Sequence, residues 1–428
     1  MVVEASLQSR ESPQRWVQLG LGLIAMMAIS SPQYVWTLFL KPFQTTTGSG
    51  LAAIQFTFSL LIVLQTFFSP AQGWLIERFG ARALITTGAA LSGLGWILAA
   101  WIDGLWGLYA TYGLFCGIGT GIVYVGIVGL MVRWFPRARG LATGVVAAGY
   151  GFGAILTTFP IDAMIKTAGY RATLITFGAL LGLVGVAASF FLRMPEPSEA
   201  PVTASNVGDH LACPEYSPAE MLRTPLFWLL FAMMTMMSTG GLMVISQFSA
   251  FARDFGVADV IVFGVAALPL ALTIDRITNG LTRPFFGWLS DHIGRENTMA
   301  LAFLLEALAI ALLLGYRDNA TALVLLSGLV FFGWGEIFSL FPSTLTDSFG
   351  TKYATTNYGF LYMAQGIGSV LGGPMAALLR EQTGSWVPVF LLIVTMDVLT
   401  AFLALFVLKP MRATLAQEKE LVLTPLPG

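Results

Sequence analysis

The chain has 428 residues, of which 56% are hydrophobic and only 11% carry a charged side chain. Soluble proteins usually contain about 25% charged residues, so this composition, with a mean hydropathy of +0.77, excludes an ordinary soluble domain. The formal net charge of −1 favours no class of partner. Cys116 lies in an apolar run and Cys213 in a polar loop, so we expect neither a disulfide nor a metal site.

Apolar runs of roughly 20 residues, each long enough to cross a hydrocarbon core, recur along the whole chain. We predict an all-α membrane protein with twelve transmembrane helices. The first six cover approximately residues 16–40, 51–77, 81–102, 105–132, 139–166 and 171–193. The second six cover approximately residues 225–252, 258–290, 296–316, 320–346, 352–380 and 386–409. The first run is too long for a signal-peptide core and has no small-residue cleavage pattern, so we interpret it as a span.

A polar segment separates the two sets of spans. Residues 194–224 are rich in Pro, Ser, Glu and Asp and contain His210, which is typical of a solvated linker. We therefore predict two pseudo-symmetric six-helix bundles, at residues 1–193 and 225–428, joined by a cytoplasmic linker. Lys and Arg are concentrated in the loops that face the cytoplasm if the N-terminus is inside, so the positive-inside rule places both termini in the cytoplasm.

The two sets of spans resemble one another in sequence. Ser69–Leu75 aligns with Arg283–Leu289, and both segments end in Gly-Trp-Leu. Tyr124 on the fourth span matches Phe338 on the tenth. Repeats of this kind place a substrate near the middle of the membrane, between halves that move against each other.

A charged turn follows each copy of this repeat. The first turn contains Glu77, Arg78 and Arg82, and the second contains Asp291 and Arg295. Both turns lie on the predicted cytoplasmic side, where ion pairs could hold one conformation closed. The alternative is that these charges only set the orientation of the chain in the membrane.

These turns resemble the loop signature of the major facilitator superfamily, and the resemblance covers all twelve spans. Further segments follow in order: Ser31–Leu38, Arg133–Pro136 with Arg139–Gly140, Ala147–Gly151, Glu220–Trp228, Arg283–Phe285, Leu340–Thr344 and Asn357–Phe360. Together they resemble the bacterial oxalate:formate antiporter family, which is related to the monocarboxylate carriers. The resemblance implies a secondary transporter of small carboxylates that works by alternating access, without fixing the substrate.

Arg283 is the first candidate for binding the substrate. A cation at the centre of a membrane helix costs about 2.5–3.5 kcal/mol on insertion scales, so it normally faces a partner or a watery cavity. Its guanidinium stays charged, and its planar fork matches a carboxylate. The resemblance implies that this arginine binds the substrate carboxylate. The alternative is a structural ion pair.

Two other polar residues share a helix face with Arg283. Arg276 lies seven residues earlier, which is about 10 Å along the helix and only about 20° around it, and Asn279 lies between them. One interpretation is a track of two positive charges for anions. The other is that Arg276 is neutralised by Asp275 or by Glu336.

Glu336 on the tenth span is the candidate for proton coupling. A carboxyl group in a low dielectric retains its proton more readily, and anion binding beside it could be linked to that proton. The alternative is that Glu336 balances the charge of Arg276. Glu306 and Asp397 lie on the ninth and twelfth spans, which tend to be peripheral in this fold, so we leave them out of the predicted site.

The chain departs from the resembled family at two positions. Gln365 on the eleventh span stands where that family has a lysine, and Phe338 stands where it has a tyrosine. A glutamine cannot neutralise a second carboxylate. Either Arg276 supplies the missing charge and dianions still bind, or the site prefers monocarboxylates such as formate or lactate.

Aromatic walls with a few hydroxyl and amide donors suit a small planar anion. We predict that such a cage is completed by Gln33, Tyr34, Trp36, Gln55, Tyr124, Tyr150, Trp334, Tyr362 and Gln365. Ordinary helix packing is the alternative for each of these residues.

The sequence leaves three classes of function to consider for this chain. The first is a carrier, working by anion exchange or by proton–monocarboxylate symport. The second is an intramembrane enzyme, which would need a nucleophile–base pair or metal ligands and is disfavoured because His210 and His292 both lie in predicted loops. No phosphate-binding lysine motif for ATP-driven pumping is present. The third is a channel or a membrane sensor of organic anions. We expect a multi-pass protein of the inner membrane that acts as a monomer, with a small carboxylate and the lipid bilayer as partners and with no cofactor, metal or nucleic acid.

Overall fold

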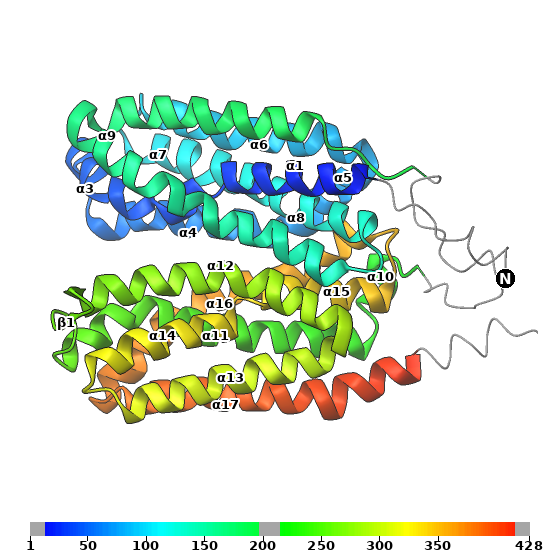
Figure 1. The fold of residues 1–428 in the computed structure, drawn as a ribbon. Helices are drawn as coiled ribbons and strands as arrows, with labels where there is room; N and C mark the ends of the chain where they lie inside the picture. The colour runs from blue at the N-terminus through cyan, green and yellow to red at the C-terminus, as the bar shows by residue number, and fades with distance from the viewer. Residues whose placement is uncertain (1–12, 197–214, 416–428) are drawn as a thin grey trace, which may run out of the picture.

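The computed structural model describes residues 13–196 and 215–415 (Figure 1). His210 and Cys213 of the predicted linker lie outside the described residues. Apart from the connecting loops, the described chain is helical with one antiparallel hairpin, formed by β1 (Ile261–Val262) and β2 (Val265–Ala266).

The helices form two groups that lie one above the other in Figure 1. The first group contains α1 (Gln14–Ala28), α2 (Ser31–Tyr34), α3 (Trp36–Thr47), α4 (Leu51–Phe67), α5 (Ser69–Phe79), α6 (Ala81–Ala99), α7 (Leu105–Leu108), the π-helix η2 (Tyr109–Phe115), α8 (Cys116–Trp134) and α9 (Arg139–Phe190). The second group contains α11 (Pro225–Asp254), α12 (Ala267–Ile293), α13 (Arg295–Gly315), α14 (Ala320–Trp334), α15 (Ile337–Phe349), α16 (Ala354–Thr383), α17 (Val387–Leu403) and the π-helix η4 (Ala404–Leu408). The short helix α10 (Pro218–Met221) precedes α11.

Local sequence explains where these helices bend. Proline cannot donate a backbone hydrogen bond, so it breaks a helix or begins a new one. Pro70 stands in the first turn of α5, which is bent by 50° from α4. Gly169 has φ 83° and ψ 161°, and it divides α9 into two arms that together contain the predicted fifth and sixth spans.

The predicted spans match the described helices in order, but several boundaries differ. The first span was predicted to end at residue 40, whereas α3 continues to Thr47. The eighth span was predicted over residues 258–290, but α12 begins only at Ala267. The apolar residues before it form the β1–β2 hairpin, whose turn contains Phe263 (φ 51°) and Gly264 (φ 83°). By length and composition alone, seven of the described helices can cross a membrane, or up to nine if each of two bent pairs is one span.

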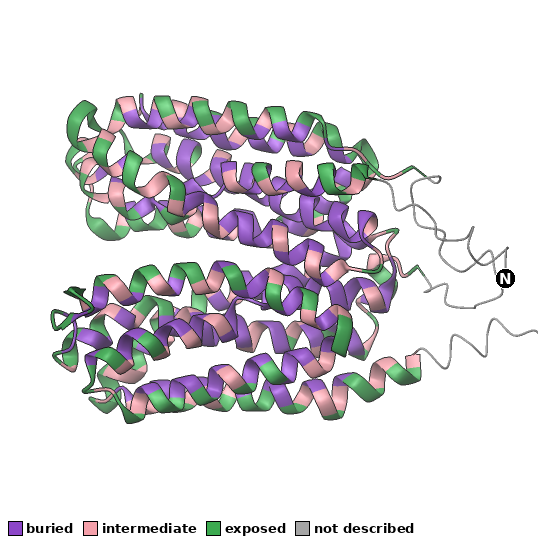
Figure 2. Cartoon of the chain, viewed as in Figure 1, coloured by how far each residue is buried: buried purple, intermediate pink, exposed green. Residues whose placement is uncertain are grey.

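The two groups make their closest contact near the end of the molecule that carries Gln14 and Leu415, which we call the terminus end; the opposite end, with β1 and β2, is the hairpin end. A Cβ atom on Gly140 of α9 would lie 2.2 Å from the backbone oxygen of Gly287 on α12. A Cβ atom on Gly73 of α5 would lie 2.7 Å from backbone atoms of α16. Such backbone contact requires glycine. Figure 2 shows buried residues concentrated in this half of the interface.

The groups separate toward the hairpin end. The last close contacts join Gly280 to Phe152 and Gly366 to Thr66. Every hydrogen bond between the two groups, within the described residues, lies between these contacts and the terminus end. The structure is therefore closed at the terminus end.

Candidate functional site

Arg283 lies between the two helix groups and is only 2% exposed. Its guanidinium donates to the backbone oxygen of Ala147 on α9 and to Oδ1 of Asn279 at 2.9 Å. It also lies over the ring of Phe338, 4.6 Å from the ring centre. Among the described residues no carboxylate is within ion-pair distance of Arg283, and its Nε–H is buried without a partner. The group is therefore held in place but not neutralised by an ion pair.

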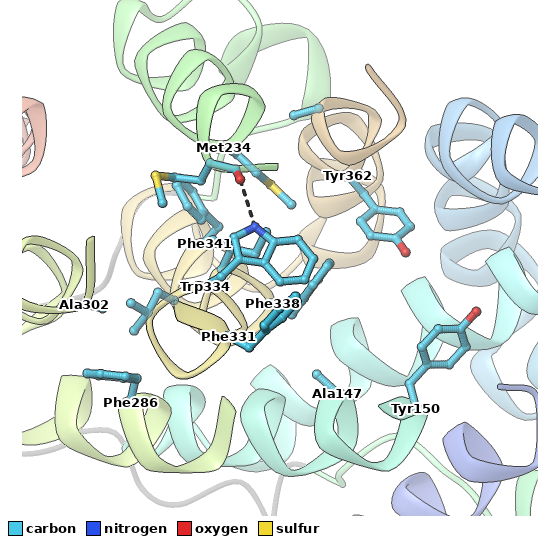
Figure 3. Packing of buried hydrophobic residues seen from close by; sticks show 14 of the residues in the cluster. Ala147, Tyr150, Met234, Phe286, Ala302, Phe331, Trp334, Phe338, Phe341 and Tyr362 are labelled. Carbon is cyan, nitrogen blue, oxygen red and sulfur yellow. Dashed lines mark hydrogen bonds between the residues drawn. The ribbon is translucent and has the colours of Figure 1, made fainter. Parts of the chain in front are cut away.

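A cluster of tyrosine rings lies near this cation, and Tyr124 and Tyr362 interact with it electrostatically. Tyr124 stacks on Tyr362 with ring centres 4.9 Å apart, and it meets Tyr150 edge to face at 5.3 Å. Figure 3 shows Tyr150 on α9 and Tyr362 on α16 pointing toward each other. Tyr34 packs against Tyr150 at 5.5 Å. The structure thus brings four of the predicted aromatic residues together from both groups.

Polar side chains fix the orientation of two of these tyrosines. The Tyr150 hydroxyl donates to Oε1 of Gln33 at 2.5 Å, and Nε2 of Gln65 donates to the Tyr362 hydroxyl at 3.0 Å. The Tyr124 hydroxyl is buried and has no partner within the described residues. It lies next to the Tyr358 side chain and interacts electrostatically with Arg283.

Three predicted cage residues lie elsewhere or behind this layer. Trp36 donates to Oε1 of Gln55 at 3.1 Å and packs on Tyr112, in a separate core cluster of the first group. Trp334 donates to the backbone oxygen of Met237 at 2.9 Å and packs behind Phe338 (Figure 3). Trp334 therefore packs against the Phe338 ring, which lies under Arg283, and does not face the guanidinium itself.

Arg276 lies on α12 two turns from Arg283, toward the hairpin end. Its side chain is exposed, whereas the neighbouring Asp275 is 3% exposed. Neither of the predicted ion pairs, with Asp275 or with Glu336, occurs among the described residues. Arg276 is thus an exposed cation on the side where the helix groups separate.

Gln365 lies on α16, three residues beyond Tyr362 toward the hairpin end. It is 8% exposed, and its Oε1 atom is buried without a partner among the described residues. Only its Nε2 amide group could donate a hydrogen bond to an anion.

Glu336 is fully buried at the break between α14 and α15. Neither of its carboxyl oxygens has a hydrogen-bond partner within the described chain. It interacts electrostatically with Arg283, not with Arg276. The predicted alternative, in which it balances Arg276, has no contact in this structure to support it.

Sequence reasoning missed several residues that the fold brings to the site. Tyr358 is buried and packs on Tyr362 at 5.6 Å, and Gln65 holds the Tyr362 hydroxyl. Tyr358 precedes Tyr362 by one helical turn, so the shared face was a signal that could have identified it. Glu306 and Asp397 were treated as peripheral but are fully buried.

The charged turns meet the opposite helix group at the terminus end. Glu77 accepts hydrogen bonds from the backbone N–H of Thr355 at 3.0 Å and of the next residue, in the first turn of α16. Asp291 accepts from the backbone N–H of Gly140 at 3.0 Å and of the next residue, in the first turn of α9. A carboxylate is stabilised at a helix N-terminus, so each group caps a helix of the other.

Ion pairs reinforce these two caps. Glu77 pairs with Arg133 at 3.3 Å, and Asp291 pairs with Arg295 at 2.6 Å. By contrast, Arg78 stacks on a tryptophan of its own helix and Arg82 donates to a carbonyl oxygen within the first group. Of the predicted gating residues, Glu77, Asp291 and Arg295 therefore lie at the closed interface.

Comparison with known proteins gives the family. A sequence profile described as the Major Facilitator Superfamily matches residues 19–274 and 237–427. The chain is 34% identical to the oxalate:formate antiporter of Oxalobacter formigenes, over 93% of this chain and 92% of that protein. It is 26% identical to monocarboxylate transporter 13 of Bos taurus, over 82% of this chain and 80% of that protein. The solved structure of the proton:xylose symporter XylE matches with a TM-score of 0.72 at 14% identity, over 93% of this chain and 96% of XylE.

These similarities confirm the predicted resemblance and the all-α fold, and they confirm that the chain is a multi-pass membrane protein and a transporter, not an enzyme. The chain belongs to the Major Facilitator Superfamily and, within it, to the family that includes the oxalate:formate antiporter.

Proposed function

We propose that this chain is a secondary active transporter that moves small carboxylates by alternating access, with Arg283 binding the substrate carboxylate. One observation carries the proposal: a buried guanidinium between the two helix groups that has no carboxylate within ion-pair distance among the described residues. Only two of its five N–H groups are used by Ala147 and Asn279. The others are available for a charge-assisted, two-pronged hydrogen bond to an anion.

The relatives support the same class of substrate. One is named as an oxalate:formate antiporter and another as a monocarboxylate transporter. The tyrosines around Arg283 offer apolar ring faces together with hydroxyl donors, which suits a small planar anion.

The closed terminus end supports alternating access. In this conformation a substrate would reach Arg283 from the hairpin end, passing the exposed Arg276 first. Transport would then require the caps at Glu77 and Asp291 to open while the hairpin end closes. With the terminus end in the cytoplasm, as the basic loops favour, this conformation would be the outward-facing one of a carrier that we propose to act as a monomer in the inner membrane.

Counterflow in proteoliposomes tests this proposal. Vesicles loaded with unlabelled oxalate, formate, acetate, lactate or malonate are diluted into the labelled form of the same anion. We expect transient accumulation for at least one of them, at a rate at least tenfold above protein-free vesicles. If every anion of the panel behaves as in protein-free vesicles, the proposed function is wrong.

We predict that Gln365→Lys raises the preference for oxalate over formate by about tenfold, which corresponds to about 1.4 kcal/mol. The added ammonium would offset the second carboxylate of oxalate, which an amide cannot do. The measurement is the ratio of inhibition constants of the two anions in the same uptake assay. Gln365→Met, which has similar size and no charge, is the control. An unchanged ratio in Gln365→Lys would exclude this position from the choice of substrate charge.

A second candidate function is proton-coupled monocarboxylate symport, and the buried Glu336 beside Arg283 favours it. We predict that Glu336→Gln abolishes the increase in uptake caused by an acidic outside solution, because an amide cannot take up the proton. Exchange of labelled for unlabelled substrate at equal pH should continue, since it needs no net proton movement. If the pH dependence is the same as in the unmodified protein, Glu336 is not the coupling group.

A further inference from the structure

Three acidic side chains lie close to one another, buried inside the second helix group. They are Glu306 on α13, Glu336 between α14 and α15, and Asp397 on α17, and all three are 0% exposed. None of their six carboxyl oxygens has a hydrogen-bond partner within the described residues. We call them the acidic trio.

Glycines allow the helices that carry the trio to approach one another. A Cβ atom on Gly333 of α14 would lie 2.7 Å from Cβ of Glu306, which places Glu306 one helical turn from Glu336. A Cβ atom on Gly240 of α11 would lie 3.7 Å from Oδ1 of Asp397. The trio is thus enclosed by α11, α13, α14 and α17.

The carboxyl groups interact with one another more than with any cation. Glu306 interacts electrostatically with Asp397 and Glu336, and Glu336 also interacts with Arg283. Moving one carboxylate from water into a protein interior costs several kcal/mol unless it is paired. A single guanidinium cannot offset three negative charges, so most of the trio must carry protons.

The other charged groups on the surrounding helices lie at the ends of those helices. At the hairpin end, Asp254 of α11 pairs with Arg380. At the terminus end, Arg295 and Glu296 of α13 and Asp347 of α15 are engaged in ion pairs. On α12, Asp275 is buried but does not interact with the trio. Within the described residues, no group of three or more acidic, His or Cys side chains is arranged to hold a metal ion.

We propose that Glu306, Glu336 and Asp397 form one shared proton-binding site, which gains a proton when Arg283 binds a carboxylate and loses it when the carboxylate leaves. This inference rests on the proposed function. With Arg283 unoccupied, its charge stabilises one carboxylate of the trio through Glu336. When the substrate anion neutralises Arg283, that stabilisation is lost, and the carboxylate takes up a proton from water on the same side. The substrate anion and the proton are both released on the other side, so one proton moves with each substrate anion.

The test uses Glu306→Gln and Asp397→Asn, which keep the size of each side chain but remove its ability to ionise. Oxalate and lactate are the probes, each added to proteoliposomes that contain a pH-sensitive dye. We expect both variants to keep exchange at equal pH within about twofold of the unmodified protein and to lose at least tenfold of the substrate-driven proton movement. Asp275→Asn, which changes a buried carboxyl group outside the trio, should keep both activities.

Two outcomes overturn the proposal: proton movement in both variants equal to that of the unmodified protein, or no proton movement in the unmodified protein although exchange is measurable. Absence of exchange in the unmodified protein would instead reject the proposed carrier function. If the variants do not fold, infrared difference spectra of the unmodified protein decide the question. Substrate binding should increase the C=O band of protonated carboxylic acids, and an unchanged band contradicts the inference.

Discussion

Arg283→Lys is expected to reduce carboxylate uptake into proteoliposomes by at least tenfold, and Arg283→Ala to abolish it. Lysine keeps the positive charge, but its single ammonium cannot hold Ala147 and Asn279 and also present two parallel donors to an anion. Loss of one charge-assisted hydrogen bond is worth about 1.5–3 kcal/mol, which is roughly ten- to a hundredfold in binding. The measurement is the initial rate of labelled oxalate or formate uptake, normalised to folded protein.

Arg317→Lys is the matched control for this experiment. Arg317 also lies over an aromatic ring, that of Phe255 at 5.5 Å, but it stands between α13 and α14 at the hairpin end. Its replacement should leave uptake within about twofold. If Arg283→Lys and Arg283→Ala both transport as well as the control, the guanidinium does not bind the substrate.

The sequence was a good guide to features that repeat along a helix. Long apolar runs predicted the helices, and the seven-residue spacing of Arg276 and Arg283 predicted that both lie on one face of α12, where Arg276 is exposed and Arg283 is buried. It was a poor guide where an apolar run does not form a helix. The hairpin at Ile261–Ala266 has the hydropathy of a span, and only the turn at Phe263–Gly264 distinguishes it.

Contacts between distant segments were harder to predict. The acidic residue in each charged turn was recognised, but its partner is the first turn of a helix in the opposite group, such as Thr355 for Glu77. Backbone N–H groups leave no pattern in the sequence. Similarly, Glu306 and Asp397 lie on helices that face lipid on one side. Hydropathy does not reveal whether an isolated carboxyl group on such a helix points toward lipid or toward the protein interior. Only the packing of α11 and α14 against them shows that they are buried.

Glycines on α9 and α12, among them Gly140, Gly144 and Gly287, bring the two helix groups into backbone contact. These glycines lie close to Arg283. A Cβ atom on Gly144 would lie 2.2 Å from the backbone oxygen of Arg283. The same close approach therefore seals the terminus end and brings Ala147 within reach of the guanidinium. Closing the terminus end and positioning the Arg283 guanidinium are therefore coupled in this geometry.

Gly140→Ala is therefore expected to reduce transport by at least tenfold while leaving the helix intact. Alanine is about 1 kcal/mol better than glycine inside a helix, so α9 itself should be stabilised. Its Cβ atom, however, would lie 2.2 Å from the backbone oxygen of Gly287, and this backbone cannot withdraw by the required ångström without separating the groups. The Cβ atom would also lie 2.6 Å from Nη1 of Arg295, a side-chain atom that can move aside more easily. The closed terminus end would lose population, and the hairpin end should close in compensation.

Spin labels at Phe159 on α9 and Leu272 on α12, both exposed at the hairpin end, provide the measurement. Their separation is expected to shorten in Gly140→Ala. Gly151→Ala is the control, because a Cβ atom there meets nothing within 4 Å; it makes the same chemical change on the same helix and should alter neither transport nor the label distance. Normal transport and an unchanged distance in Gly140→Ala would mean that the glycine contact at the terminus end is not part of the transport cycle.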